Sequence, residues 1–462
     1  MRTSFPKLFL SLPRTELTSL TLKERTAMTE TLDVRKRKIA YFFLIFSTIF
    51  LYVSLTGAKN IYSSEKTTLY ELGIFGNFTD LATTMEYYFY TYAAMQIFLI
   101  FFVKKINIKW FLTATLGISA LLIGAVPFTD DIVQHYVLYA VNGVLQAGIW
   151  GCLLKVLSLH LPLRLLPLAN QIMSAGPAVS GAVGYGVAAA FGENWKLPFI
   201  LMSLILLAAV ATYFISVTYM EKFPKEIEMH HVVHSDGTEE DVSDDDENDF
   251  IHLDNKKRII LFYALSTLLS FLFTLLYFAV NNNLDVYLKE IGGFSNGKSK
   301  LLTIFAPVVA VIGPFICVRM CEMRKNFITV CSFFFGAAML VSLSLIFLFD
   351  KSAILSLILV VLFILLVNGG RSVTLSIASL RMRSKIDTGV YSTMVNAVAS
   401  IASGFAPKLI TRVLDNASYT TDESWKISFV MVFVFSLVTV ALLMACNLFV
   451  KVANRKKYAE EK

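Results

Sequence analysis

Residues 363–380 read FILLVNGGRSVTLSIASL, an apolar and small-residue run that contains one charged residue, Arg371. A helix of about 20 such residues is long enough to cross the ~30 Å hydrocarbon core of a bilayer. Similar runs recur along the whole chain of 462 residues, which is 56% hydrophobic and only 16% charged. Soluble domains carry roughly a quarter charged residues. The sequence therefore predicts an all-α protein that crosses a membrane many times.

The apolar runs predict about twelve transmembrane helices. Their expected ranges are 39–62, 85–103, 110–128, 133–156, 166–191, 197–219, 258–283, 300–320, 326–348, 353–378, 388–412 and 426–450. Residues 1–38 are polar and basic and show no cleavable signal peptide, so we expect a cytoplasmic N-terminal arm. Residues 451–462 form the expected cytoplasmic tail.

Basic residues gather in alternate loops between the predicted spans. They lie at residues 35–38, Lys104, Lys105, Lys109, Arg319, Arg324, Lys325, Arg381, Arg383, Lys385, Lys451, Arg455, Lys456 and Lys457. Because short cytoplasmic loops carry an excess of lysine and arginine, this pattern predicts a cell-membrane protein with both termini in the cytoplasm. The same bias explains the net charge of +7, which therefore indicates no nucleic-acid partner.

A polar insert at 221–257 divides the predicted spans into an N-terminal bundle of six at 39–220 and a C-terminal bundle of six at 258–450. The insert contains the acidic run HSDGTEEDVSDDDENDF, which has too few apolar residues to fold on its own. His230, His231 and His234 could bind a metal, but a disordered cytoplasmic linker is favoured. Two six-helix halves joined in this way resemble the major facilitator transporters, whose halves pack around a site near the membrane midplane.

The sequence predicts neither a cofactor nor an enzyme. It carries no P-loop, GxSxG, HExxH or Rossmann glycine pattern. The five cysteines lie scattered through or beside predicted spans, where we interpret them as small apolar residues and not as disulfides or metal ligands. Without an ATPase motif, any pumping must draw on a gradient of an ion or a solute.

Four segments resemble the organophosphate:phosphate antiporter branch of the major facilitators, which contains the glycerol-phosphate and hexose-phosphate transporters. They are GAKNIYSS at 57–64, NGVLQAGIWGCLLKVLSLHLPLRLLPLANQIMSAGPAVSGAVGYG at 142–186, NNNLDVYLKEIGGFSNGKSK at 281–300 and DTGVYSTMVNAVASIASGFAPKLI at 387–410. In that branch two arginines and a histidine grip a phosphate. The resemblance pairs these positions with Ala58, Tyr277 and Pro177, so none of the three ligands stands in its expected place.

Two cations lie deepest in the predicted spans, Lys59 in the first and Arg371 in the tenth. A charge at the centre of a transmembrane helix costs roughly 2.5–3.5 kcal/mol on insertion scales, so it usually faces a cavity or a partner. In the six-plus-six layout both spans border the central cavity, and we predict that these cations bind an anionic substrate. The alternatives are that Lys59 snorkels to the membrane surface and that Arg371 pairs with a buried carboxylate.

Further substrate contacts are predicted on the neighbouring spans. Tyr88 belongs to the aromatic run YYFYTY, which could line the cavity or form an interfacial belt. Gln146 and Trp150 are four residues apart and share one face of a continuous helix. Trp150 would then stack on a substrate while Gln146 hydrogen-bonds it, although packing between helices would use the same residues.

Asparagines supply the remaining candidates. Asn281 begins a run of three asparagines that predicts a helix break, which would suit an extracellular gate, a substrate contact or a simple helix end. Asn368 lies three residues before Arg371 and faces the same way, and Asn396 lies centrally in the eleventh span.

Three charged residues near the ends of the first two spans, Glu65, Lys66 and Glu86, could be solvent-exposed. Glu65 and Glu86 are also the candidates for a proton carrier in the first half. Exchange against phosphate and symport with protons both stay open.

The sequence therefore predicts a secondary active transporter of a small organic anion, with a phosphorylated metabolite as one candidate, that works by alternating access as a monomer in the lipid bilayer. The alternative is a membrane sensor of a sugar phosphate that signals to a partner through the acidic linker and the N-terminal arm.

Overall fold

The computed structural model describes residues 22–102, 105–129, 131–162, 165–223, 256–323, 327–375 and 388–460. Every regular element within these ranges is a helix, which confirms the predicted fold class. Most of the predicted N-terminal arm and of the acidic linker, including its histidines, lies outside the described residues.

The first half of the molecule comprises the elements before the linker. They are α1 (Leu22–Glu71), α2 (Phe78–Phe102), α3 (Ile108–Ala125), the short 3₁₀ helix η2 (Val126–Phe128), α4 (Ile132–Gln146), α5 (Ile149–His160), α6 (Leu166–Phe191) and α7 (Lys196–Met220). Its apolar side chains form one continuous core.

The second half comprises the elements after the linker. They are α8 (Lys256–Asn281), α9 (Leu284–Glu290), α10 (Asn296–Thr303), α11 (Phe305–Ala310), α12 (Ile312–Met323), α13 (Phe327–Leu348), α14 (Ala353–Leu375), α16 (Thr388–Leu414) and α17 (Thr421–Glu460). A second core lies here, so each half packs largely around its own interior.

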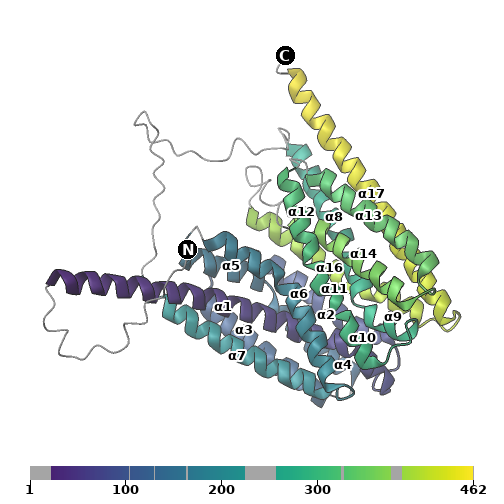
Figure 1. The fold of residues 1–462 in the computed structure, drawn as a ribbon, viewed down its shortest axis with the longest axis horizontal. Helices are drawn as coiled ribbons and strands as arrows, with labels where there is room; N and C mark the ends of the chain where they lie inside the picture. Colours follow the sequence, from purple (N-terminus) through teal and green to yellow (C-terminus); the bar gives the residue numbers. More distant parts are fainter. Residues whose placement is uncertain are drawn as a thin grey trace, which may run out of the picture.

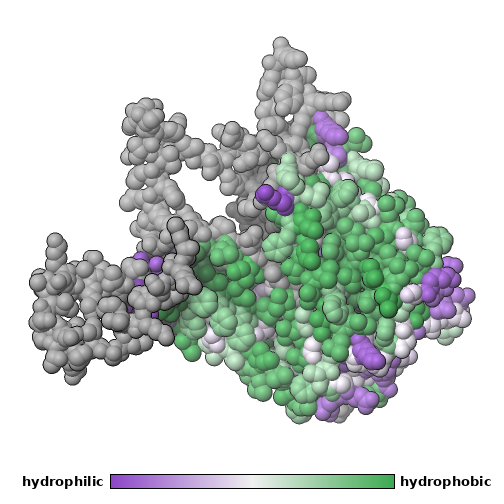
Figure 2. Space-filling view, viewed as in Figure 1, coloured by the Kyte–Doolittle hydropathy of each residue, from purple (hydrophilic) through white to green (hydrophobic). Residues whose placement is uncertain are grey.

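Ten stretches of the described chain are long and apolar enough to cross a membrane. The two other predicted spans, 85–103 and 166–191, fall on α2 and α6, which have 25 and 26 residues but are not among the ten. The count of twelve therefore stays a prediction. A broad apolar surface covers both halves in Figure 2, as expected for a protein that contacts lipid.

The predicted span at 133–156 falls within one apolar stretch, Ile132–His160, but the expectation of one continuous helix there is wrong. The helix ends at Gln146 and restarts at Ile149, because Gly148 adopts a left-handed backbone with φ of 75°. That conformation suits glycine, which lacks a Cβ, and it interrupts the helical ladder. Gln146 and Trp150 therefore lie on two different helices and do not share one helical face.

The two halves contact each other at one end of the molecule, here called the joined end, which carries the turns at 72–77, 192–195, 282–283 and 415–420. There α2 packs on α16, α6 on α10 and α11, and α1 on α9 and α10. Gly404 permits the approach of α16 to α2, since a Cβ at this position would meet the Phe89 Cβ at 3.0 Å. In Figure 1 the halves lie side by side near α9 and α10, whereas the first residues of α1 and the last of α17 lie far apart.

Candidate functional site

The two predicted cations lie on opposite halves and flank one pair of aromatic rings. The Lys59 Nζ on α1 lies 5.0 Å from the centre of the Phe89 ring. The guanidinium carbon of Arg371 on α14 lies 5.5 Å from the Phe278 ring, and the Phe89 and Phe278 rings contact each other at 5.8 Å. This arrangement, here called the cation–aromatic layer, is completed by Tyr88, 5.7 Å from Lys59, and Tyr277, 5.0 Å from Arg371.

The partners of the two cations differ. Within the described ranges Lys59 forms no hydrogen bond or ion pair. Its ammonium group lies over the faces of the Tyr88 and Phe89 rings instead. Arg371 donates from Nη1 to Asn368 Oδ1 at 3.1 Å, and Asn368 in turn donates to the Ala310 carbonyl at 2.9 Å. The predicted shared face of Asn368 and Arg371 is therefore confirmed, and Asn368 helps to orient the guanidinium.

Trp150 and Asn396 lie beside this layer. The Trp150 ring contacts the Tyr52 ring at 5.3 Å, and Tyr52 lies within electrostatic reach of Arg371. Asn396 on α16 lies beside the hydroxyl group of Tyr92, whose ring stacks on Tyr88 at 5.9 Å. Both predicted residues thus belong to the aromatic surroundings of the cations.

Gln146 is placed differently, inside the first half. Its Oε1 accepts a hydrogen bond from the Tyr88 hydroxyl at 2.6 Å, and its Nε2 donates to Ser119 Oγ at 2.8 Å. Only 1% of Gln146 is exposed. Gln146 therefore holds the Tyr88 hydroxyl group in place. Its position between α2 and α3 agrees with the alternative that it packs between helices.

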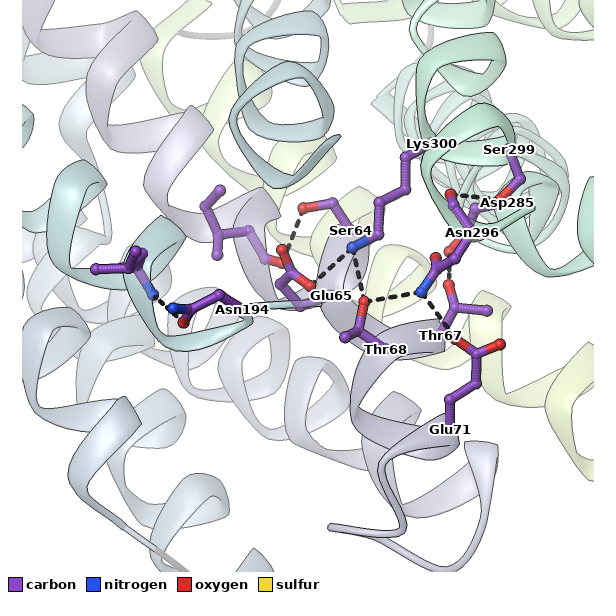
Figure 3. Close-up of polar contacts among 12 residues, drawn as sticks. Ser64, Glu65, Thr67, Thr68, Glu71, Asn194, Asp285, Asn296, Ser299 and Lys300 are labelled. Atoms are coloured by element: carbon purple, nitrogen blue, oxygen red, sulfur yellow. Dashed lines mark hydrogen bonds and ion pairs between the residues drawn. The ribbon is translucent and has the colours of Figure 1, made fainter. Parts of the chain in front are cut away.

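A buried polar cluster, here called the gate cluster, joins the two halves at the joined end (Figure 3). Lys300 on α10 donates from Nζ to Glu65 Oε2 at 2.8 Å and to Thr68 Oγ1 at 2.7 Å. One residue before Thr68 on α1, the Thr67 hydroxyl donates to Asp285 Oδ2 on α9 at 2.6 Å. The side chains of Glu65 and Lys300 are 0% and 1% exposed, so their ion pair is shielded from water.

Lys66 holds the helix break that the asparagine run predicted. The α8 helix ends at Asn281, and Lys66 Nζ donates to the Asn282 carbonyl at 2.9 Å and to Asn283 Oδ1 at 2.8 Å. A cation at a helix C-terminus interacts favourably with the carbonyl groups left unpaired there. Asn281 itself is half-buried and donates to Asn282 Oδ1 at 3.3 Å.

The expectation that Glu65 and Lys66 could be exposed is wrong. They are 0% and 4% exposed, because α1 continues as a helix to Glu71 and packs there against α9 and α10. Glu86 is also largely covered, since Lys408 on α16 donates to its Oε2 at 2.6 Å.

Sequence reasoning missed the partners on the second half. Lys300, Asp285 and Lys408 make the cross-half bonds described above, and Asp415 caps α2 by accepting from the Thr79 amide at 2.7 Å. Their sequence signal is that Asp285 and Lys300 fall inside the quoted segment 281–300, and Lys408 inside the quoted segment 387–410.

A bundle of membrane-spanning helices in two halves, closed by polar contacts at one end and carrying two cations between the halves, has the architecture of a secondary transporter. The family profile described as Major Facilitator Superfamily matches residues 39–407, which is most of the chain. The chain belongs to the Major Facilitator Superfamily.

Solved structures of similar fold come from the same class. A bacterial homologue of the human lysosomal transporter Spinster, in an inward-facing and unoccupied conformation, has a TM-score of 0.65 and 11% identity over 90% of this chain and 98% of its own. The nucleoside transporter NupG has a TM-score of 0.58 and 14% identity over 88% of this chain and 98% of its own. A D-xylose-proton symporter has a TM-score of 0.63 and 10% identity over 87% of this chain and 97% of its own. No curated protein matches this chain by sequence.

Proposed function

We propose that this protein is a secondary active transporter that moves a small organic anion across the membrane by alternating access. Membership of the superfamily supports transport, and the observation that carries the anion is the cation–aromatic layer. Lys59 and Arg371 come from opposite halves, and each lies against the rings that separate them. A ligand held by both cations would therefore draw the two halves together.

The chemistry of the layer favours an organic anion with a flat or apolar body. The guanidinium of Arg371 offers parallel N–H donors that suit a carboxylate or a phosphate. Around it, Tyr52, Trp150 and Tyr277 supply ring faces that can pack on an apolar group. Sites for small molecules commonly combine such an apolar lining with a few charged groups that fix orientation.

The position of Tyr277 supports an anion site despite the missing family ligands. The resemblance to the organophosphate antiporters places an arginine near residue 277, where this chain has tyrosine. The Arg371 guanidinium lies 5.0 Å from that tyrosine ring. Arg371 therefore brings a cation from α14 to the neighbourhood in which the resemblance expects one on α8, just as Lys59 follows Ala58 on α1. A phosphorylated metabolite stays within the proposed substrate class.

The conformation fits one step of alternating access. The gate cluster closes the joined end, and the loops rich in lysine and arginine lie at the opposite end, as Lys105 and Lys109 after α2 illustrate. With the basic loops in the cytoplasm, the joined end is extracellular, both termini are cytoplasmic and the molecule is closed to the outside.

The test is uptake into liposomes that contain the purified protein. Radiolabelled carboxylates, aromatic carboxylates, sugar phosphates and inorganic phosphate are offered in parallel with a neutral sugar and an organic cation. Uptake of at least one organic anion, competed by its analogues, is the expected result. Uptake of the neutral or cationic solute alone would overturn the proposal, and saturable anion binding without uptake would favour the sensor.

A further inference from the structure

The gate cluster contains a carboxylate whose environment suits a proton. Glu65 is 0% exposed, and Lys300 binds one of its two oxygens, Oε2. The other oxygen, Oε1, is buried and has no hydrogen-bond partner among the described residues. A buried carboxylate needs partners on both oxygens to offset the loss of water, and an oxygen without one is a site where a proton can bind.

The charges that face Glu65 come from several helices. Lys300 on α10 is its ion-pair partner, Lys66 follows it on α1, and Asp285 on α9 is a second buried carboxylate close enough to repel it. The α6 helix, which packs on α1 and α10, has no charged residue and contributes the buried Tyr185 hydroxyl near Asp285. Burial and the neighbouring negative charge of Asp285 therefore favour the neutral form of Glu65, and Lys300 supplies the attraction that favours the ionised form.

Ionisation of Glu65 has a mechanical consequence because its partner lies on the other half. While Glu65 is charged, separating the halves at the joined end would break a shielded ion pair. When Glu65 is neutral, Lys300 is a buried cation whose remaining bond is to Thr68. Such a cation is costly to keep out of water, and opening the joined end hydrates it.

We infer that Glu65 is a proton-binding site that couples proton uptake to opening of the joined end. This inference rests on the proposed function in one respect, since it names the proton as the coupling ion of that transporter. Binding of a proton at Oε1 neutralises Glu65 and releases Lys300, and the halves separate on that side. Loss of the proton restores the ion pair and closes the joined end.

The experiment measures the conformation directly and needs no substrate. Spin labels are placed at Glu193→Cys, in the turn after α6, and at Ala417→Cys, in the turn after α16; both positions are exposed and lie on opposite halves. The five native cysteines are buried. Distances between the labels are then measured in nanodiscs between about pH 8 and about pH 5, and one coupled proton changes the ratio of open to closed molecules by at most about tenfold per pH unit.

The expected result is a short distance at high pH and a growing population of longer distances as the pH falls. Glu65→Gln mimics the protonated residue and should give the longer distance at every pH. Glu71→Gln is the matched control, because Glu71 also pairs across the halves, with Lys289, but is partly exposed. Its pH dependence should match that of the unmodified protein.

A distance distribution in the unmodified protein that does not change with pH would overturn the inference, and so would an unchanged pH dependence in Glu65→Gln. If Glu65→Gln fails to fold, Glu65→Asp serves instead, since its infrared carboxylic-acid band should shift relative to the unmodified protein if Glu65 takes up the proton. An unshifted band would count against the inference. A response to sodium at constant pH, without a response to protons, would also contradict it.

The failure of this inference can be told apart from the failure of the proposed function. A gate that opens with acid in a protein that takes up no anion supports the proton site and contradicts the anion transporter. Anion uptake by a protein whose joined end does not respond to pH supports the transporter and contradicts the proton site.

Discussion

The gate cluster and the cation–aromatic layer both place charged side chains between the two halves, but these side chains have different partners. In the gate cluster Lys300 binds Glu65 and Thr68 directly, and both charges are shielded from water. In the layer Lys59 faces ring systems and forms no described ion pair. In the proposed mechanism the gate cluster uses its own ion pair to hold the halves together, whereas the layer keeps the charge of Lys59 for a ligand.

The largest effect should come from removing the Arg371 guanidinium from the cation–aromatic layer. Arg371→Ala should reduce anion transport by roughly 100-fold, because a lost charge partner costs about 3 kcal/mol. Expression should be little changed. Arg371→Lys keeps the charge without the planar fork and should lose about tenfold. Uptake into liposomes measures both, and wild-type transport by Arg371→Ala would show that the layer does not bind the substrate.

A comparable effect on conformation should follow from breaking the gate cluster. Lys300→Met leaves Glu65 buried without its cation, which should destabilise the closed joined end by about 3 kcal/mol. The label distance between positions 193 and 417 reports the change. The double variant Glu65→Gln with Lys300→Met removes both charges and should recover much of the closed population. Equal opening in the single and double variants would show that the ion pair does not hold the halves.

Lys59 should matter less than Arg371, because its charge has no fork and a ligand can approach it in more than one way. Lys59→Met should weaken anion binding by about tenfold, or about 1.4 kcal/mol. Lys59→Arg should retain most of the affinity. Titration calorimetry with the best anion from the uptake screen measures the difference, and unchanged affinity in Lys59→Met would assign the anion to Arg371 alone.

The smallest effect is expected where the cross-half ion pair is partly exposed. Glu86 and Lys408 have side chains that are 13% and 16% exposed. Water screens such a pair, so Glu86→Gln should shift the closed population by no more than about 1 kcal/mol. Glu221→Gln is the control, since Glu221 pairs with Lys109 inside the first half and should leave the label distance unchanged. A large opening in Glu86→Gln would make α2 and α16 the principal gate.

Sequence reasoning reached the fold and the contact between Asn368 and Arg371 because both depend on local pattern. Apolar runs predicted the helices, and the three-residue spacing of Asn368 and Arg371 predicted their shared face. The gate cluster was out of reach because its partners are distant in sequence; Lys300 and Glu65 are 235 residues apart. A charge near the end of an apolar run looks exposed until the opposite half is present to cover it.

The break at Gly148 was missed for a different reason. The sequence around it is apolar enough to continue a helix, and a glycine within an apolar run does not by itself reveal a left-handed backbone. Only the tertiary packing decides whether such a glycine bends the chain or is carried within a regular helix.

The uninterrupted course of α1 has a consequence for the timescales of local opening. Lys59 and Glu65 lie on one continuous helix about 9 Å apart along its axis, at 1.5 Å per residue, whereas α8 stops at Asn281 and α9 resumes at Leu284. The Asn282 amide donates to the Phe278 carbonyl at 3.2 Å and the Asn283 amide to the Val280 carbonyl at 3.3 Å. Both distances are longer than the usual ~2.9–3.0 Å of an N–H···O bond. Hydrogen–deuterium exchange should therefore be slow through α1 between Lys59 and Glu65 and faster at the asparagine turn, so that of the two segments facing each other at the joined end α1 is the rigid one and the α8–α9 turn the one that opens locally.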